Sequence, residues 1–374
     1  MTIPFHGSPS PTLGVELELG LVDLSTGGLV GAAAQVLERL ADGPMEEKVK
    51  HELFQCTVEV ITGVCDTVEQ ARTDLETSLC ALRVVTDAAG LGVIGSGSHP
   101  FSDWRDLEVS PGERYAHLID TIQWPARRLA INGVHFHVGV PSGPDSIKVV
   151  RSLAYHLPLF LAAAASSPYW LGSDTGMASS RTKVFEGLPT AGLPPRLADW
   201  QEFESLMDGL LAAEVITSIR EIWWDCRPHP DFGTVELRMC DGITNLDDVA
   251  ALAALAQCLV ASMLDRLAAG EQLPDAPEWV VRENKWLASR HGLDSSFIVD
   301  GAGHRTPAVE LLATLIDDLV PTAARLGCSD ELAAVHTLVA RGPSYRRQRR
   351  IVADGGTLGD VVRALVDEHR HGAP

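Results

Sequence analysis

The chain has 374 residues, of which 45% are hydrophobic and 21% charged, so it can bury a large core and is not an intrinsically disordered protein. Acidic side chains outnumber basic ones by 50 to 30, and the net charge of −20 disfavours nucleic acid and anionic membranes as partners. The 7 cysteines are scattered without a Cys-x-x-Cys pair, which argues against a disulfide framework or a zinc ribbon.

The first hundred residues are predicted to alternate between strands and helices. Residues 12–24 form a strand that ends in a turn at 23–28, and a helix over 32–41 follows. A strand over 53–62 leads to a long amphipathic helix over 66–90, with Asp66 or Thr67 as the expected N-cap and Gly90 as the C-terminal stop. A short strand over 91–96 then runs into a loop rich in glycine and serine at 95–101.

The rest of the chain is predicted to be mainly helical around two further strand regions. A helix over 113–124 precedes a strand over 131–141, and a helix over 145–166 is expected to bend or break before Pro158. The long loop over 167–200 is of the kind that is usually functional or mobile. A strand-loop-strand unit over 219–241 is followed by helices over 246–269 and 276–291 and by a mostly helical C-terminal third, with a last helix near 357–369. This order predicts an α+β fold with one antiparallel sheet and flanking helices.

The termini and the apolar runs carry no signal for export or for a membrane span. The N-terminus lacks a charged region followed by an apolar stretch. The longest apolar run, 157–166, is too short to cross a bilayer. We therefore expect a cytoplasmic protein without a membrane partner.

Acidic residues and histidines recur at every second position inside apolar, strand-like runs. The acidic members are Glu16, Glu18, Glu59 and Glu236, and Glu52 stands shortly before Glu59. In a strand, residues i and i+2 point to the same face of the sheet. The spacing therefore predicts a carboxylate-lined face, to which the neighbouring histidines of residues 133–139 also belong.

Such a face requires cations. Removing unpaired carboxylates from water costs several kcal/mol each, whereas a whole domain is stable by only about 5–15 kcal/mol. Hard divalent cations that prefer oxygen ligands are the natural partners, which indicates Mg²⁺ or Mn²⁺.

Eight segments, in chain order, resemble the bacterial type 2 glutamate–cysteine ligase family, specifically its carboxylate–amine ligase branch. No single segment is decisive, but the ordered set from residue 12 to about residue 300 is specific. The segments are residues 14–19 (Gly-Val-Glu-Leu-Glu-Leu), 51–62, 95–101, 132–139 (Asn-Gly-Val-His-Phe-His-Val-Gly), 180–181, 222–228 (Ile-Trp-Trp-Asp-Cys-Arg-Pro), 234–241 (Thr-Val-Glu-Leu-Arg-Met-Cys-Asp) and 283–293.

The resemblance implies a glutamine-synthetase-like catalytic fold, in which a curved antiparallel sheet forms a funnel for ATP and two or three Mg²⁺ (or Mn²⁺) ions. It also implies that a carboxylate is activated by phosphorylation and that an amine then captures the acyl phosphate. The whole chain would be one catalytic domain, with a ligase core over about 12–300 and a helical part over about 301–374. The family often has Glu-Glu-Glu in the first strand, but here Leu17 separates Glu16 from Glu18 and points away from the acidic face.

The family's metal ligands map onto six positions of this sequence. By resemblance, one metal would be held by Glu18, Glu52 and Glu59. A second would be held by Glu16, His135 and Glu236. The alternative for each of these residues is a structural role on an exposed strand face or in a loop.

The resemblance also assigns roles beside the metals. His137 would touch nucleotide or substrate, and Arg238, with its planar fork of donors, suits the transferring phosphoryl group. Arg227 would bind the substrate carboxylate or the phosphate, and Arg181 would close over the substrate. The glycine- and serine-rich loop, through Gly97 and Ser98, would let the backbone approach the nucleotide. The structural alternative is an ion pair for Arg227 and Arg238 and an ordinary turn for the loop.

Two other functions stay open at this point. A divalent-metal hydrolase could use the same acids and histidines to activate water, but it would leave Arg238 and Arg181 without a purpose. A non-catalytic binding protein descended from a ligase would tolerate changes at the metal-facing acids. For a ligase, glutamate and cysteine are the default substrates of the family, while other carboxylic acids and amines or amino acids remain open, and a homo-oligomer is expected only by analogy.

Overall fold

The computed structural model describes residues 2–41, 43 and 45–372. Its centre is a seven-stranded sheet in the order β2-β3-β1-β5-β9-β8, and β4 pairs with the second half of β1. All of these pairings are antiparallel, as predicted. The strands are β1 (Leu13–Asp23), β2 (Val49–His51), β3 (Thr57–Ile61), β4 (Leu91–Ile94), β5 (Gly133–Gly139), β8 (Cys226–His229) and β9 (Thr234–Asp241).

One face of the sheet is covered by three long helices, α2 (Val68–Ala88), α5 (Gly143–Ala164) and α8 (Leu246–Ala268). The side chains of β1 explain why the helices cover this face. Its apolar residues, at every second position, are all buried in the main core: Leu13, Val15, Leu17, Leu19 and Leu21. Burying five aliphatic side chains from one strand contributes about 1.5–3 kcal/mol each. The side chains between them point to the opposite face, which is free for polar groups.

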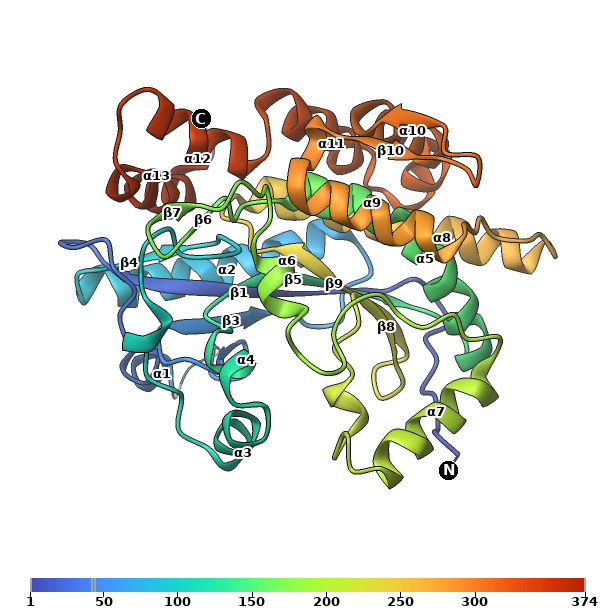
Figure 1. The fold of residues 1–374 in the computed structure, drawn as a ribbon, viewed down its shortest axis with the longest axis horizontal. Helices are drawn as coiled ribbons and strands as arrows, with labels where there is room; N and C mark the ends of the chain where they lie inside the picture. Colours follow the sequence, from blue (N-terminus) through green and yellow to red (C-terminus); the bar gives the residue numbers. More distant parts are fainter. Residues whose placement is uncertain (1, 42, 44, 373–374) are drawn as a thin grey trace.

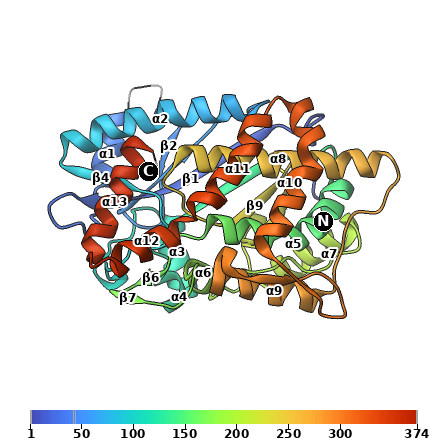
Figure 2. The same cartoon turned by 90° about the horizontal axis from the view of Figure 1, so that it is seen from above.

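The C-terminal helices form an outer layer on the core helices, as Figures 1 and 2 show. Helices α10 and α11 pack on α8, α9 packs on α5, and α13 packs on β4. A small hairpin of β10 and β11 interrupts this mostly helical part. The bounds are α9 (Glu278–His291), β10 (Ser296–Ile298), β11 (Arg305–Pro307), α10 (Ala308–Leu326), α11 (Ser329–Arg341), α12 (Ser344–Ala353) and α13 (Leu358–His371).

Helices α5 and α8 are long and apolar enough to cross a membrane by length and composition alone. However, 72% and 83% of their most apolar windows lie buried inside the protein. Both pack against the sheet and against each other. Their hydropathy is therefore accounted for by their place in the core of a globular protein.

The other face of the sheet is flanked by short elements rather than covered. In Figure 1, α3 and α4 lie below one half of the sheet, α7 lies below the other half, and α6 lies in front of its centre.

The bounds of the elements not yet given, in chain order, are α1 (Ala33–Leu40), α3 (Glu113–Ile122), α4 (Trp124–Arg127), β6 (Tyr169–Trp170), β7 (Ser173–Asp174), α6 (Arg181–Phe185) and α7 (Trp200–Ala212), with single 3₁₀ turns at Trp104–Asp106, Ile219–Glu221 and Gly292–Asp294.

Several local predictions differ from the structure. The segment expected to be a loop over 167–200 contains the short elements β6, β7 and α6. Of the strand expected over 53–62, only Thr57–Ile61 form β3, which makes a hairpin with β2. Leu53, Phe54 and Cys56 are instead buried in a separate cluster with residues of α3 and of the segment after α4. Helix α5 is continuous through Pro158, since its burial on the sheet offsets the one lost backbone hydrogen bond. Helix α7 was not predicted; its Phe203 and Met207 are buried in a small cluster with Trp224.

Candidate active site

The open face of the sheet carries a row of acidic side chains and histidines. Strand pairing sets Glu18 opposite Glu59, and it sets Glu16 opposite His135. On the other side of β5, Glu236 stands opposite His137, and Arg227 of β8 stands opposite Glu236. Glu52 joins the row from the loop that connects β2 to β3. We call the seven residues Glu16, Glu18, Glu52, Glu59, His135, His137 and Glu236 the carboxylate row.

The row contains three overlapping groups that could each hold a metal ion. Among the described residues, the ligand atoms within each group lie within 4.8 Å of one another. The groups are Glu18, Glu52 and Glu59; Glu16, Glu59 and His135; and Glu16, His137 and Glu236. Two ligands of one Mg²⁺ ion stand at most about 4 Å apart, so small side-chain movements would complete each group. Because neighbouring groups share Glu59 or Glu16, the arrangement suits ions bridged by carboxylates.

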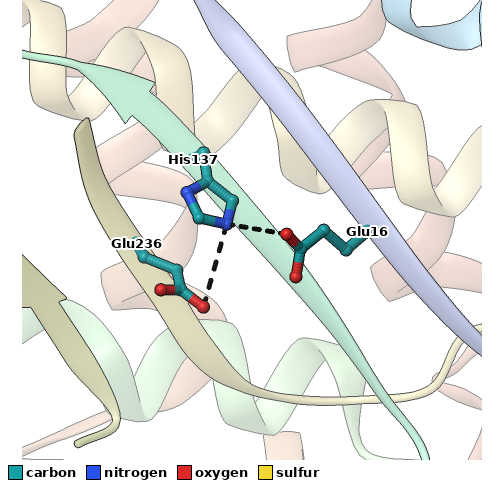
Figure 3. Close-up of side chains that lie close together, drawn as sticks. All are labelled: Glu16, His137 and Glu236. Carbon is teal, nitrogen blue, oxygen red and sulfur yellow. Dashed lines mark ion pairs between the residues drawn. The ribbon is translucent and has the colours of Figure 1, made fainter. Parts of the chain in front are cut away.

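Both histidines lie near the second predicted metal group. The sequence resemblance grouped His135 with Glu16 and Glu236; among the three groups above, Glu236 is grouped with Glu16 and His137 (Figure 3). His137 Nε2 lies 3.2 Å from Glu16 Oε1 and 3.8 Å from Glu236 Oε1. A register shift between Val134 and Phe136 in the β5–β9 pairing brings Glu236 opposite His137. His135, which belongs to the group of Glu16 and Glu59, has its Nδ1 2.9 Å from Glu16 Oε2 and 4.0 Å from Glu236 Oε1.

The donor set fits divalent cations. The Nε2 atoms of His135 and His137 are buried and make no hydrogen bond within the described part of the chain. Burial, followed by the charge of Arg238, lowers the pKa of His135 to about 4, so its imidazole is neutral near pH 7 and can bind a metal. Burial opposes the charged form of His137, but the neighbouring Glu236 and Glu16 raise its pKa, so this imidazole would have to release its proton to bind a metal. The carboxylate oxygens of the row are the ligands that Mg²⁺ and Mn²⁺ prefer, and the imidazoles would add to them.

The end of the row at Glu236 already contains compensating positive charge. Its carboxylate is buried and accepts a hydrogen bond of 2.7 Å from Arg227 Nε and a second bond from Arg238 Nη1. Burial opposes ionisation, but the two guanidinium groups hold the pKa of Glu236 well below its usual range. Burial also opposes the ionisation of Glu16, but the neighbouring imidazoles of His135 and His137 outweigh it and lower the pKa of the carboxyl.

The opposite end of the row lacks such compensation. Burial, and then the charge of Glu52, raise the pKa of Glu18 to about 7. Burial also raises the pKa of Glu52, and burial together with three neighbouring glutamates raises that of Glu59 well above its usual value. Three carboxyl groups crowded in this way would ionise together only beside a positive charge, which a bound cation would supply.

Arg181 enters this end of the row from α6. Its guanidinium is buried beside the carbonyl oxygen of Arg238 at 3.4 Å. A Cβ atom on Gly133 would stand 2.2 Å from Arg181 Nη2, so only glycine lets the guanidinium approach β5. The N–H group of Gly133 donates a 2.5 Å hydrogen bond to Glu18 Oε2. The glycine therefore places an arginine and a carboxylate side by side.

Two cavities meet the carboxylate row. The larger, of about 600 Å³, includes Glu16, Glu59 and His137 in its wall, together with Lys50, Val64 and Phe232. The smaller, of about 120 Å³, includes Glu18, Glu52, Arg181 and Arg238. We call them the large chamber and the small chamber. The two cavities thus contact different members of the row.

The other predicted site residues make internal contacts. Arg227 Nη1 donates to the carbonyl oxygens of Arg220 at 2.9 Å and Ile222 at 2.5 Å, and its Nε donates to Glu236, so most of its donors are occupied. The loop with Gly97 and Ser98 lies away from the row. Gly97 N–H donates to Ser166 Oγ, and Ser98 Oγ donates to the carbonyl oxygen of Tyr169. The structure does not bring Gly97 and Ser98 to the carboxylate row.

Several residues of the small chamber were not identified from the sequence. Arg114 and Tyr115 of α3, Phe185 of α6 and Trp223 contribute to its wall. Arg114 and Tyr115 come from a helix with no strand-like spacing, so their approach to Glu52 depends on the tertiary fold. For Trp223 a signal existed, because it belongs to the Trp-Trp-Asp-Cys-Arg segment of the family resemblance.

Sequence and fold comparisons identify the family. The model of glutamate-cysteine ligase family 2 matches residues 12–364. A Frankia casuarinae protein provisionally named glutamate–cysteine ligase 2-1 is 50% identical over 378 residues, covering 100% of this chain and 99% of the relative. A Thermobifida fusca protein provisionally named glutamate–cysteine ligase 2 is 49% identical over 377 residues, covering 100% of this chain and 94% of the relative.

Two solved structures share the fold. The glutamate–cysteine ligase of Francisella tularensis in complex with AMP has a TM-score of 0.70 at 11% identity, over 98% of this chain and 90% of that chain. A bifunctional glutathione synthetase from Pasteurella multocida has a TM-score of 0.71 at 13% identity, over 96% of this chain and 52% of that chain. These matches confirm the expected glutamine-synthetase-like α+β fold. With the family match they confirm the resemblance inferred from the ordered motifs: the chain belongs to glutamate-cysteine ligase family 2.

Proposed function

We propose that the protein joins a carboxylic acid to an amine, with ATP as the phosphoryl donor and an acyl phosphate as the intermediate. The observation that carries this proposal is that different members of the carboxylate row line two chambers, and that Arg181 and Arg238 line the smaller one. A phosphoryl transfer requires a donor and an acceptor on opposite sides of a set of cations. The names of the relatives support the same reaction class, since they are called glutamate–cysteine ligases.

The large chamber suits the nucleotide. Its volume of about 600 Å³ lies within the usual range for small-molecule sites, and its wall contains Val64, Phe232 and Lys50. Phe232 is 58% exposed and stacks on His229, so one aromatic surface remains open to a base. The AMP complex of the Francisella tularensis ligase, which has the same fold, supports a nucleotide site in this architecture.

The small chamber suits the acid and the amine. Arg181 and Arg238 are planar donors that can bind a carboxylate or the phosphoryl group passed to it. The carboxylate row would hold two or three Mg²⁺ ions, which when bound neutralise phosphate charge and hold the two reacting oxygens in line. Glu18, Glu52 and Glu59 would bind the ion nearest the small chamber, and Glu16, His137 and Glu236 the one nearest the large chamber. Glutamate and cysteine are the substrate pair to test first.

The atoms balance in two steps. A carboxylate oxygen of the acid attacks the γ-phosphorus, the bond to the β,γ-bridging oxygen breaks, and ADP leaves. The amine nitrogen then attacks the acyl carbon, phosphate leaves with the former carboxylate oxygen, and the nitrogen loses a proton. Arg227 binds no ligand in this scheme, because its hydrogen bonds hold Glu236 and the backbone before β8.

Isotope transfer tests the proposal. The protein is incubated with Mg²⁺, ATP, an ¹⁸O-labelled carboxylic acid and hydroxylamine as a general amine, beginning with glutamate. We expect a hydroxamate, ADP and phosphate that carries one ¹⁸O atom. Release of AMP and pyrophosphate would contradict the acyl phosphate route. ATP-independent hydrolysis of an amide by the metal-loaded protein would instead favour a hydrolase.

A further inference from the structure

Helix α6 brings Arg181 and Phe185 to the small chamber, but it is too short to hold itself in place. It has five residues, Arg181–Phe185, and Ser180 at its N-cap makes no side-chain capping bond. A helix of one turn has no stability of its own in water. The position of Arg181 must therefore be fixed by contacts between α6 and the rest of the fold.

The N-terminal end of α6 is fixed by a buried aspartate of β9. Asp241 Oδ1 accepts a 2.7 Å hydrogen bond from Ser179 Oγ, and Asp241 Oδ2 accepts one of 2.7 Å from Ser167 Oγ. Ser167 Oγ in turn accepts the N–H group of Arg181 at 3.1 Å. This end of the helix is thus joined to the strand that carries Glu236 and Arg238.

The C-terminal end of α6 is fixed by a buried lysine of α9. Lys285 Nζ lies 2.7 Å from Glu186 Oε1, and Glu186 is the residue that ends α6. The same ammonium lies 2.5 Å from Asp225 Oδ2. The side chains of Lys285 and Asp225 are only 6% and 4% exposed, so this pair is desolvated, whereas Glu186 is 30% exposed at the edge of the cluster.

Asp225 links the cluster to the other arginine. Its carbonyl oxygen accepts a 2.8 Å hydrogen bond from the N–H group of Arg238, and its own N–H group donates to the carbonyl oxygen of Gly192 at 2.7 Å. One ammonium therefore joins the helix that carries Arg181 to the segment that pairs with Arg238. Burial opposes the charged form, but Asp225 and Glu186 outweigh it and raise the pKa of Lys285, so the ammonium remains charged.

We propose that Lys285 is a positioning residue of the ligase reaction, which sets the guanidinium of Arg181 against that of Arg238 by tying Glu186 to Asp225. This inference rests on the proposed function. Without the ammonium, the buried carboxylate of Asp225 would lose its counter-ion, and Glu186 would lose the group that holds it beside Asp225, so the two carboxylates would separate. The end of α6 would then move away from β9, and Arg181 would lose its place in the small chamber. Displacements of about 1 Å at such positions cost up to about 100-fold in rate.

The test compares Lys285→Met with Lys183→Met in the full chain. Lys183 contacts the same Glu186 at 2.8 Å, but its side chain is 31% exposed and it forms no ion pair with Asp225 among the described residues. For Lys285→Met we expect kcat/KM for the acid to fall about 10- to 100-fold, ATP affinity to stay within about twofold, and amide hydrogen exchange to rise over residues 179–188. Lys183→Met changes each quantity by less than about twofold.

A double mutant distinguishes positioning from general stability. If Lys285 acts through Arg181, adding Lys285→Met to Arg181→Met lowers kcat/KM little further. If Lys285→Met lowered kcat/KM equally in the wild type and in Arg181→Met, the proposal would be overturned. Amide hydrogen exchange over residues 179–188 that did not change in Lys285→Met would also overturn it. If Lys285→Met does not fold, Glu186→Gln replaces only the α6 partner of Lys285. For this variant we expect a smaller fall in kcat/KM and a smaller rise in hydrogen exchange over residues 179–188. A wild-type protein that couples no acid would refute the proposed function, whereas the exchange measurement would still decide the role of Lys285.

Discussion

The two ends of the carboxylate row use the same residue type in opposite electrostatic states. At one end, Glu236 lies between Arg227 and Arg238, and its carboxyl pKa is lowered. At the other end, Glu18 and Glu59 lie among other glutamates, and their pKa values are raised. The comparison indicates that the charge of Glu236 is already compensated by the two arginines in the metal-free fold, whereas the carboxyls of Glu18 and Glu59 have no such compensation. It therefore predicts that substitutions at the two ends affect the stability of the metal-free protein in opposite directions.

The largest effect is expected for Glu236→Gln. The substitution leaves Arg227 and Arg238 without their shared carboxylate in a buried site, so we expect a loss of about 3–5 kcal/mol in the free energy of unfolding and a loss of product formation. Urea unfolding in the presence of a chelator measures the first quantity. Glu271→Gln is the matched control, since its ion pair with Arg266 is exposed, and it costs at most about 1 kcal/mol. Equal stability losses in the two variants would remove the distinction between the ends.

The other end of the row contributes to the pH dependence of the metal-free protein. The pKa of Glu18 is raised to about 7 in the folded state, and those of Glu52 and Glu59 are raised as well. The folded state then binds more protons than the unfolded chain above an ordinary glutamate pKa of about 4.3. The contribution of these three carboxyl groups to stability therefore falls as pH rises from about 4.5 through 7.

Buried histidines such as His99, His135 and His156, whose pKa values burial lowers to about 4, contribute the opposite slope up to an unfolded pKa of about 6.5. Unfolding in a chelator at pH 5.5 and pH 8 is therefore compared between the wild type and Glu18→Gln, and we expect the wild type to lose more stability, or gain less, between the two pH values. The same pH dependence in both proteins would contradict the raised pKa of Glu18.

Glu59→Gln is expected to separate stability from activity. Removing one of three crowded carboxylates relieves repulsion, so the metal-free protein gains about 1–3 kcal/mol at pH 8, while kcat falls by about 100-fold or more because a metal ligand is lost. Thermal unfolding in a chelator and the coupled assay measure the two effects. A destabilised Glu59→Gln variant would show that this end of the row is held by internal contacts.

The smallest effect is expected for Gly133→Ala. Its new methyl group must displace the end of the Arg181 side chain, so kcat/KM falls about tenfold while the free energy of unfolding changes by about 1 kcal/mol or less. Gly209→Ala in α7 is the matched control, since a Cβ there meets no atom within 4 Å. Unaltered kinetics of Gly133→Ala would show that the approach of Arg181 to β5 is not needed.

Much of the site could be predicted from strand periodicity. The alternation in β1 placed Glu16 and Glu18 on one face, and the same rule placed Glu236 and Arg238 together on β9. The partner of Glu236 across the strands could not be derived in this way. It depends on the irregular pairing between β5 and β9, which no local pattern encodes and which brings His137 into place.

The sequence was least informative where function depends on contacts between distant segments. Arg227 looked like a ligand-binding residue, but the carbonyl oxygens of Arg220 and Ile222 occupy its donors. Lys285 looked like an ordinary helix residue, but its partners lie 60 and 99 positions earlier in the chain, at Asp225 and Glu186. Such long-range pairs follow only from the packing of α6 and α9 around the sheet.

The most direct test of the central claim is a count of Mn²⁺ ions bound in the presence of a non-hydrolysable ATP analogue. Electron paramagnetic resonance during a Mn²⁺ titration reports both the number of bound ions and whether they interact. We predict two or three ions per chain, magnetically coupled because neighbouring groups share Glu16 and Glu59, and the loss of at least one ion in Glu59→Gln. A protein that binds the analogue but no Mn²⁺, or whose Mn²⁺ binding is unchanged in Glu59→Gln, would contradict the claim that this sheet face is a metal site.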